Sequence, residues 1–274
     1  MKMYTIKPAL ERASIEDYVG LFRSSFADSK FSADYLRWQY LENPHGRVIG
    51  MDAFNGDELV AHYAIIPRRY ALASKTFRAA LSVNTATHPD HQGPQGLFFR
   101  LAKATYKSAE ESGVQFIVGA ANAKSFRGFT RILNFRSLGH IRLYASLGAV
   151  PPKTDALDVS MDADWASWRF RNPARNYSVA GRSCVQLSTV VKGVPFHLAN
   201  VPHEAVGCLP DLRKGLRFMP GLTPYFGPEA PSFGQLPLRF QPSPWHVIWK
   251  ALDSGLAPDL PAKLRLDGLG MDTF

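Results

Sequence analysis

The chain has 274 residues, a formal net charge of +9, 46% hydrophobic residues and 20% charged residues. This length suggests two domains or one large one, and this apolar content excludes wholesale disorder. No run approaches the roughly 18 apolar residues of a membrane helix, and the N-terminus lacks the apolar run of a signal peptide, so we expect a soluble, cytoplasmic protein. The two cysteines, Cys184 and Cys208, allow at most one disulfide and exclude a cysteine-based zinc cluster.

Charge and proline are distributed unevenly along the chain. Residues 1–150 contain 19 Lys and Arg against 12 Asp and Glu, a net charge of +7, whereas residues 151–274 carry +2. The second part holds 15 of the 20 prolines. This change of composition predicts a domain boundary near residue 150. The basic surplus of the first part favours an anionic partner, and an ordinary mixed surface that is basic by chance is the alternative.

Two helices are predicted close to the N-terminus. Ser14 and Asp17 have the spacing of a capping box, in which the serine oxygen accepts from the backbone while the carboxylate reaches back. Apolar residues at helical spacing follow, so a helix is expected over residues 15–26. Ser32 is placed to cap a second helix that runs to about Leu41.

Strands are indicated by apolar runs that end at turn residues. They are predicted at residues 4–7, 48–54, 59–66, 77–87, 114–120 and 138–147. The Asn55-Gly56 dipeptide between the second and third runs is a strong hairpin signal. Pro67 is expected to end the third strand, because proline donates no ladder hydrogen bond. The continuous apolar run at 114–120 is typical of a buried central strand.

Two further helices complete the first part of the chain. Residues 96–112 have an amphipathic pattern, with Gly113 as the stop, and residues 125–133 form a shorter helix. The order β-α-α-β-β-β-α-β-α-β predicts an α/β (α+β) fold class, with helices on both faces of a mixed, largely antiparallel sheet.

The second part repeats a piece of the first. Residues 38–44 (WQYLENP) are echoed one residue shorter by residues 168–173 (WRFRNP), and a candidate hairpin follows each copy, the second at residues 177–180 and 185–191. This echo indicates a duplicated unit, with chance similarity as the alternative because the match is short. A helix is also expected at residues 209–218.

The segment from Thr87 to Phe98 carries the strongest chemical signal, because a strand ends, a glycine-containing loop follows and a helix begins. The first helical turn leaves backbone N–H groups unpaired, and with the helix dipole they favour a pyrophosphate. Gly93 and Gly96 let the backbone approach phosphate oxygens closely. An ordinary turn that needs glycine is the alternative. The loop has neither a Walker lysine nor a dinucleotide-binding fingerprint.

This loop resembles motif A of the GNAT superfamily of acyl-CoA-dependent N-acyltransferases, whose signature is Q/R-x-x-G-x-G/A. Further family features follow in order: the strand at 114–120, Asn122, Ser125, and residues 129–135 (FTRILNF), which are similar to the family ending F-Y-x-K-L-G-F. The resemblance covers about residues 1–147.

The sequence departs from the family pattern at several positions. Gln92 and Gly96 are four steps apart instead of three, so Gln92 is displaced or Gly93 takes the first motif position. Phe98 replaces the second Gly/Ala, and Thr130 stands where many members have a tyrosine that protonates the leaving thiolate. The phosphate-binding role is therefore expected to be kept more clearly than the acid role.

The resemblance implies a GNAT-type acyl-CoA-binding domain at residues 1–150, and a smaller, degenerate GNAT-like half at residues 151–274 that completes the acceptor site. Acetyl-CoA, or another acyl-CoA, is the implied co-substrate. The residues implied to bind it are Ala86, Thr87, Gln92, Gly93, Gln95, Gly96, Leu97, Phe98, Asn122 and Ser125.

The implied reaction is direct attack of an amine on the thioester, with a backbone N–H near Ala86–Thr87 stabilising the oxyanion. The catalytic candidates are His62 as a base, Asn84 as a residue that positions water, and Ser125 near the departing sulfur. An imidazole titrates close to neutral pH, although a lone strand histidine is more often structural. The eight histidines have no metal-ligand spacing, so no metal is expected.

Three functions follow from these observations. The first is an N-acyltransferase that transfers an acetyl or other acyl group to a small amine such as an amino sugar. The second is a non-catalytic acyl-CoA sensor or scaffold, which the replaced tyrosine and the lack of a clear carboxylate base favour. The third is an aminoacyl-tRNA-dependent transferase; the net charge permits it, but the sequence shows no basic stripe with interleaved aromatics, so nucleic acid is an unlikely partner.

Overall fold

The computed structural model describes residues 3–26, 31–93, 96–147, 155–180, 185–201, 213–214, 220–228, 234–237 and 245–271. The helices in these ranges are α1 (Ile15–Ser25), α2 (Ala33–Tyr40), α3 (Leu97–Glu111), α4 (Ala123–Arg131) and α5 (Ala163–Phe170), with short 3-10 helices at Pro89–His91 and Leu260–Lys263. Among the described residues, no helix is both long enough and apolar enough to cross a membrane.

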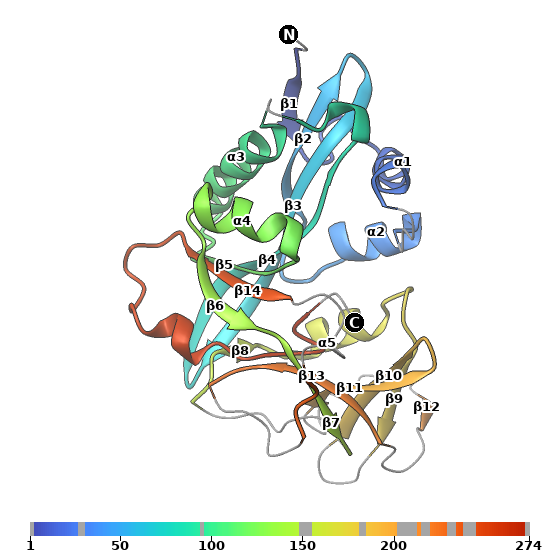
Figure 1. Cartoon of the computed structure of the whole chain (residues 1–274), viewed down its shortest axis with the longest axis vertical. Coiled ribbons are helices and arrows are strands. Elements are labelled where there is room, and N and C mark those ends of the chain that lie inside the picture. The colour runs from blue at the N-terminus through green and yellow to red at the C-terminus, as the bar shows by residue number, and fades with distance from the viewer. Residues whose placement is uncertain are drawn as a thin grey trace.

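The strands form two sheets that lie one above the other along the long axis of the molecule (Figure 1). The first sheet contains β1 (Thr5–Pro8), β2 (Ile49–Asn55), β3 (Glu58–Leu72), β4 (Lys75–Thr87), β5 (Phe116–Ala121), β14 (His246–Ala251), β6 (Arg136–His140) and, beside β3, β8 (Asp158–Val159). The second contains β12 (Arg213–Lys214), β9 (Tyr177–Ala180), β10 (Val185–Val191), β11 (Val194–Val201), β13 (Gly221–Phe226), β15 (Leu266–Asp267) and, beside β13, β7 (Arg142–Ser146).

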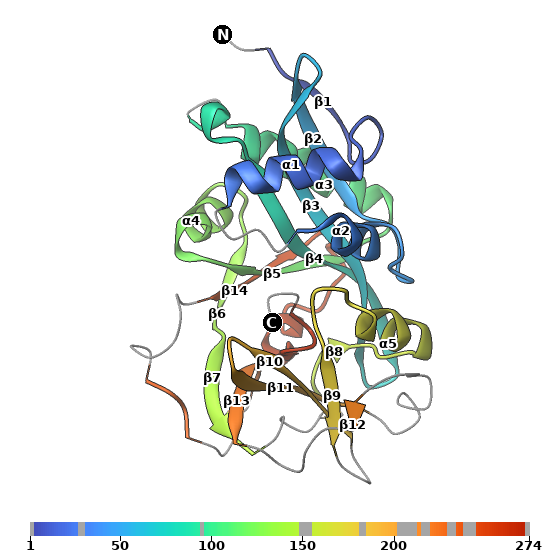
Figure 2. The same ribbon diagram turned by 90° about the vertical axis from the view of Figure 1, so that its right-hand side faces the viewer.

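The first sheet has the order β1-β2-β3-β4-β5-β14-β6. Its pairs are antiparallel apart from β4 and β5, which are parallel. Helices α1 and α2 cover one face, and α3 and α4 cover the other (Figure 2). The predicted fold class, a mixed and largely antiparallel sheet flanked by helices, is confirmed.

Strands cross between the two parts of the chain. β14 comes late in the sequence but lies between β5 and β6, where Ile248 is opposite Gly119. In return, β7 leaves the first part and pairs with β13 of the second sheet. The first sheet therefore contains β8 and β14 of the second part and the second sheet contains β7 of the first part, and the division at residue 150 stays a prediction.

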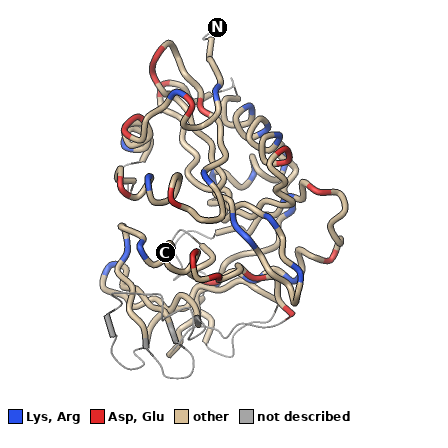
Figure 3. Tube along the Cα trace, turned by 180° about the vertical axis from the view of Figure 1, so that it is seen from behind, with Lys and Arg blue, Asp and Glu red and all other residues tan. Residues whose placement is uncertain are grey.

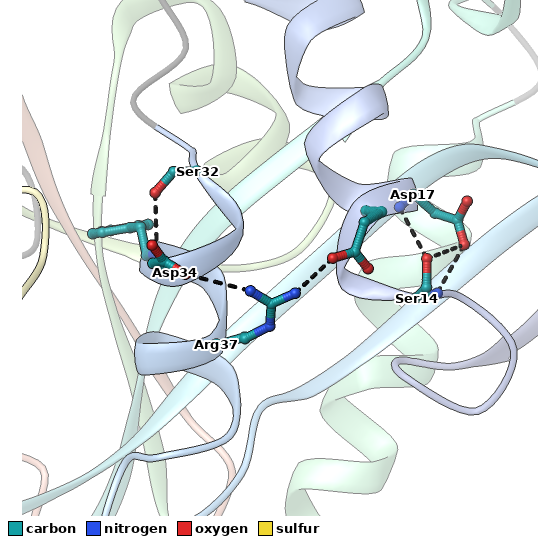
Figure 4. A network of polar contacts seen from close by, with 7 residues as sticks. Ser14, Asp17, Ser32, Asp34 and Arg37 are labelled. Carbon is teal, nitrogen blue, oxygen red and sulfur yellow. Dashed lines mark hydrogen bonds and ion pairs between the residues drawn. The ribbon is translucent and has the colours of Figure 1, made fainter.

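Local signals place α1 and α2 where they were expected. The Ser14 hydroxyl accepts the Asp17 N–H, and the Asp17 carboxylate accepts the Ser14 N–H, so the capping box is confirmed (Figure 4). Arg37 of α2 donates to Glu16 of α1 at 2.6 Å and to Asp34 of its own first turn at 3.3 Å. These ion pairs are exposed and contribute little stability, but they link the two helices.

Pro67 does not end its strand, which corrects one expectation: β3 continues to Leu72. The Pro67 carbonyl accepts the Asn43 side-chain amide at 2.8 Å, on the edge that β2 no longer covers. The N–H and C=O of a strand residue point to the same edge, so the missing N–H of Pro67 removes no ladder bond.

Two further expectations are corrected. The single strand expected at residues 138–147 is divided at Ile141, because β6 pairs with β14 in the first sheet whereas β7 pairs with β13 in the second. Within the helix expected at 209–218, Arg213–Lys214 form strand β12; the rest of that segment lies outside the described residues, as do Cys184 and Cys208.

The two copies of the repeated Trp…Asn-Pro motif contact each other in the core. The rings of Trp38 and Trp168 stack with centroids 4.5 Å apart. Each indole N–H donates to the backbone carbonyl of the other tryptophan, at 2.7 and 2.8 Å. Asn43 and Asn172 each accept a backbone N–H from two residues further on. Such reciprocal contacts are typical of twofold-related units, so they support the hypothesis of a duplication.

Candidate active site

β4 and β5 separate at one end of their pairing. They pair in parallel from Ala79 opposite Phe116 to Ser82 opposite Gly119, and both strands continue beyond this point. Although β4 is an interior strand, its residues 82–85 are half-exposed. We call the space between residues 83–87 of β4 and the end of β5 the split.

A bulge in β4 accounts for this separation. His62 of β3 is opposite Ala86, whereas Ala64 is opposite Val83, so β4 has one extra residue here. Asn84, inside the bulge, has a φ of +50°. Asparagine is one of the few residue types that adopts this left-handed conformation readily. A bulge bends the strand that carries it, which turns β4 away from its parallel neighbour.

The backbone of Thr87 presents a donor to the split. The next residue, His88, donates its N–H to Val60 of β3 at 2.8 Å. Because N–H directions alternate along a strand, the Thr87 N–H points away from β3 and the Ala86 N–H points toward it. The Gln92 side chain donates to the Thr87 carbonyl at 3.0 Å, which agrees with this direction. Of the two predicted residues, Thr87 therefore has the donor that faces the split.

Helix α3 begins beside the split, and the N–H groups of its first turn have no partner among the described residues. Its N-cap, Gly96, has a φ of +64° and makes no side-chain capping bond, and no acidic residue lies in the first turn. Gly93 has a φ of +139° and open space where a side chain would lie. Basic residues recur along α3, where Arg100 is exposed (Figure 3). The free N–H groups, the dipole and the open glycine fit an anion such as a pyrophosphate.

The other predicted loop residues differ in what they offer. The side chain of Gln92 is directed to Thr87, not to the start of α3. Leu97 is buried, and the Phe98 ring packs against Phe129 with centroids 5.4 Å apart, so both can serve a ligand only through their backbone N–H groups. Gln95 lies outside the described residues.

Asn122 and Ser125 lie together at the start of α4. The side-chain oxygen (Oδ1) of Asn122 accepts the N–H groups of Lys124 and Ser125 at 3.1 and 3.0 Å, so Asn122 is the N-cap. The Ser125 hydroxyl also donates to this oxygen, at 3.1 Å. The amide nitrogen of Asn122 has no partner among the described residues, and it is left free to donate to a ligand.

His62 is fully buried and uses both ring nitrogens. Its Nδ1 lies 2.6 Å from Asp52, and its Nε2 lies 2.8 Å from the hydroxyl of Tyr40. The structure brings Asn84 and Thr87 to the split but places His62 behind them, within the core. Thr130, at the position of the family's tyrosine, donates its hydroxyl to the Phe126 carbonyl of its own helix.

The structure adds two imidazoles that the sequence analysis missed. His246 of β14 lies opposite Ala121, the last residue of β5, and stacks on Phe126 with centroids 3.9 Å apart. His140 of β6 is next to it, at 4.4 Å. Burial and the neighbouring His140 lower the pKa of His246. No local pattern could reveal this pair, because only the insertion of β14 brings it to α4.

Residues 7–135 match the sequence model of the acetyltransferase (GNAT) domain. Residues 7–135 are therefore a domain of the GNAT superfamily. A search of curated proteins found no match. Members of this superfamily use an acyl-CoA as co-substrate, and the bulge, the split and the start of α3 lie within the matched residues.

Solved structures resemble this chain over most of its length. A probable N-acyltransferase from Enterococcus faecalis V583 covers 92% of the chain, over 73% of its own length, with a TM-score of 0.62 and 9% identity. A GCN5-related N-acetyltransferase from Kribbella flavida covers 92%, over 72% of its own length, with a TM-score of 0.62 and 15% identity. Eis1 from Mycobacterium abscessus covers 76%, over 61% of its own length, with a TM-score of 0.53 and 14% identity. At these identities the likeness concerns the fold.

Proposed function

We propose that this protein transfers an acetyl or other acyl group from CoA to the primary amine of a small molecule, by direct attack of the amine on the thioester. The observation that carries this proposal is the position of two sets of backbone donors. The start of α3 and the Thr87 N–H both lie at the end of β4 that borders the split. Amino sugars are the first acceptor class to test.

The N–H groups of the first turn of α3 would bind the CoA pyrophosphate, with Gly93 and Gly96 allowing close approach. The pantetheine arm would lie in the split, where the free amide nitrogen of Asn122 is a donor. The Thr87 N–H would hold the thioester carbonyl and stabilise the negative charge that develops on its oxygen. The N–H of the next residue, His88, is not available to the ligand, because it donates to Val60 of β3.

In the proposed reaction the amine nitrogen bonds to the carbonyl carbon, the carbon–sulfur bond breaks, and the proton lost by nitrogen is gained by sulfur. Asn84 of β4 would lie next to the attacking amine. Ser125, half-buried at the start of α4, is the candidate nearest the departing sulfur. A sensor would bind acetyl-CoA without releasing thiol in the presence of amines, which distinguishes it from this enzyme.

Substitution of Gly96 tests the cofactor site. Gly96→Asp places a negative charge where the pyrophosphate would lie, so we expect the Kd for acetyl-CoA to rise at least about tenfold, or roughly 1.4 kcal/mol. Asp tolerates the left-handed φ of this position and can cap α3, so the fold should persist. Isothermal titration calorimetry with acetyl-CoA measures the change.

Gly96→Asn is the matched control, because it has nearly the same shape and φ tolerance without the charge. Both variants lose the close approach that glycine allows, so the Kd of Gly96→Asn should lie between those of the wild type and Gly96→Asp, and the difference between the two variants isolates the charge. Equal Kd values for both variants and the wild type would place the pyrophosphate elsewhere. A wild-type protein that fails to bind acetyl-CoA at high micromolar concentration would refute the proposed function.

A further inference from the structure

A chain of buried polar side chains leads from the core to the split. Asp52 of β2, His62 of β3 and Tyr40 of α2 have no exposed surface, and Tyr40 contacts Asn84. Burial of polar groups is costly unless each is paired. Here each is paired, from Asp52 to His62 at 2.6 Å, to Tyr40 at 2.8 Å and to Asn84 at 3.1 Å.

The carboxylate of Asp52 sets the direction of these hydrogen bonds. The Tyr18 oxygen accepts the Leu10 N–H, so its single proton is donated to Asp52 at 2.7 Å. An ionised carboxylate only accepts, so Nδ1 of His62 must carry the proton that faces it. In the neutral imidazole the Nε2 of His62 is then an acceptor, and the Tyr40 hydroxyl donates to it.

The same reasoning determines which way the Asn84 amide points. Because the Tyr40 proton is used on His62, the Tyr40 oxygen is an acceptor for the Asn84 amide nitrogen. That nitrogen also donates to the Gln39 side-chain oxygen. Both amide hydrogens of Asn84 are therefore committed toward α2. Its carbonyl oxygen points the opposite way, has no partner among the described residues, and belongs to a half-exposed residue of the split.

We propose that the side-chain oxygen of Asn84 binds the N–H of the acceptor amine, and that Tyr40, His62 and Asp52 are positioning residues that hold it in this orientation. This inference rests on the proposed function. A neutral carbonyl accepts one N–H and leaves the nitrogen lone pair free to attack. The ligand that it fits is thus an uncharged primary amine.

The spacing along β4 fits this assignment. The three residues from Asn84 to Thr87 span at most about 10 Å, because the bulge shortens the extended chain. A hydrogen bond to the amine, an attack distance, a carbonyl bond and a hydrogen bond to Thr87 also total about 10 Å. Asn84 and Thr87 can therefore hold the nucleophile and the thioester carbonyl next to each other.

Kinetics with acetyl-CoA and three primary amines, glucosamine, benzylamine and spermidine, test the proposal by thiol release. Asn84→Gly keeps the positive φ but removes the acceptor, so kcat/KM for the best amine should fall at least about tenfold. Tyr40→Phe frees the amide to rotate and should raise the amine KM about threefold to tenfold. The Kd of acetyl-CoA should stay within about twofold in both variants.

Tyr106→Phe is the matched control. It also removes a buried tyrosine hydroxyl, but one that is bonded to Tyr63 in the core between α3 and the sheet. Its kcat/KM should equal that of the wild type. A wild-type kcat/KM for Asn84→Gly would overturn the inference and leave the proposed function intact. Wild-type protein that binds acetyl-CoA but releases no thiol with any amine would refute both.

The orientation of the hydrogen bonds has a separate readout. In the full-length, ¹⁵N-labelled protein, His62 should show a protonated Nδ1 and an unprotonated Nε2, with the signals assigned through their loss in His62→Gln. The reversed tautomer would turn the Tyr40 hydroxyl and the Asn84 amide the other way, and it would overturn the inference whatever the kinetics show.

Discussion

Two residues in the left-handed conformation, Asn84 and Gly96, shape the proposed site. Gly96 was predicted because a glycine between a strand and an amphipathic helix is a local signal. The positive φ of Asn84 was not, because the sequence around it is that of an ordinary strand. Its bulge depends on how β3 pairs with β4, and pairing is a property of two strands.

A single buried carboxyl group, that of Asp158, predicts how the stability of the protein depends on pH. Asp158 of β8 contacts Arg265 and lies near Asp267. Burial, and then the charge of Asp267, raise the pKa of Asp158 from 3.8 to about 6, although Arg265 opposes the change. The folded state therefore holds this proton more tightly than the unfolded chain does, and the stabilisation is lost as the pH rises from about 4 to about 6.

Asp158→Asn imitates the protonated carboxyl at every pH. The free energy of unfolding of the variant, relative to the wild type, should therefore increase between about pH 4 and about pH 7. Urea denaturation at both pH values measures the difference. Parallel pH curves for the two proteins would contradict the raised pKa.

At the scale of elements, local signals succeeded where the determining contacts are close in sequence. The caps of α1 and α2, the Asn55-Gly56 hairpin and the end of α3 at Gly113 all involve residues within a few positions of each other. The extension of β3 past Pro67 and the division of the last predicted strand at Ile141 depend on distant strands. Propensity and turn signals therefore predicted the presence of helices and strands more accurately than the residues at which they end.

The tryptophan pair between α2 and α5 makes a prediction about stability. Trp168→Phe removes the indole donor of the Trp38 carbonyl, and Trp38→Phe leaves the Trp168 carbonyl with the Arg171 N–H alone. Both weaken the stack, so each should cost about 2 kcal/mol of the free energy of unfolding. The reciprocal geometry predicts similar costs for both. A double-mutant cycle should show a coupling of about 1 kcal/mol. Urea denaturation of the four proteins measures these values.

Trp165→Phe is the control for this pair. Trp165 is equally buried, but its indole nitrogen has no hydrogen-bond partner among the described residues. Its replacement should cost less than that of Trp38 or Trp168. Strongly unequal costs for Trp38 and Trp168 would argue against the symmetric role of the repeated motif.

On the scale of the whole molecule, the exchange of strands makes the two parts depend on each other. β14 covers the edge of β5, and its residues Val247, Ile248 and Trp249 are buried. In the other direction, β6 continues into β7 and the second sheet (Figure 1). The net charge of +7 on residues 1–150 lies on the part that carries the proposed cofactor site.

A fragment of residues 1–150 should not fold stably on its own. Loss of three buried side chains of β14 removes roughly 6 kcal/mol of apolar burial, which is comparable with the total stability of a domain. The fragment should unfold without cooperativity in urea, and co-expression with residues 151–274 should restore a cooperative transition. A fragment that unfolds cooperatively and binds acetyl-CoA like the full chain would show an independent domain at residues 1–150.

The sequence by itself determined most helices and strands of the first part of the chain, the mixed sheet and the glycine loop before α3, because caps, turns and periodicity act between residues close along the chain. Tertiary structure alone decided the direction of the Asn84 amide, which depends on Tyr40 and on His62, 22 residues further along the chain. It also brought His246 to the end of β5, because β14 fills the place between β5 and β6. Such contacts form only when distant strands pack, and no local pattern encodes them.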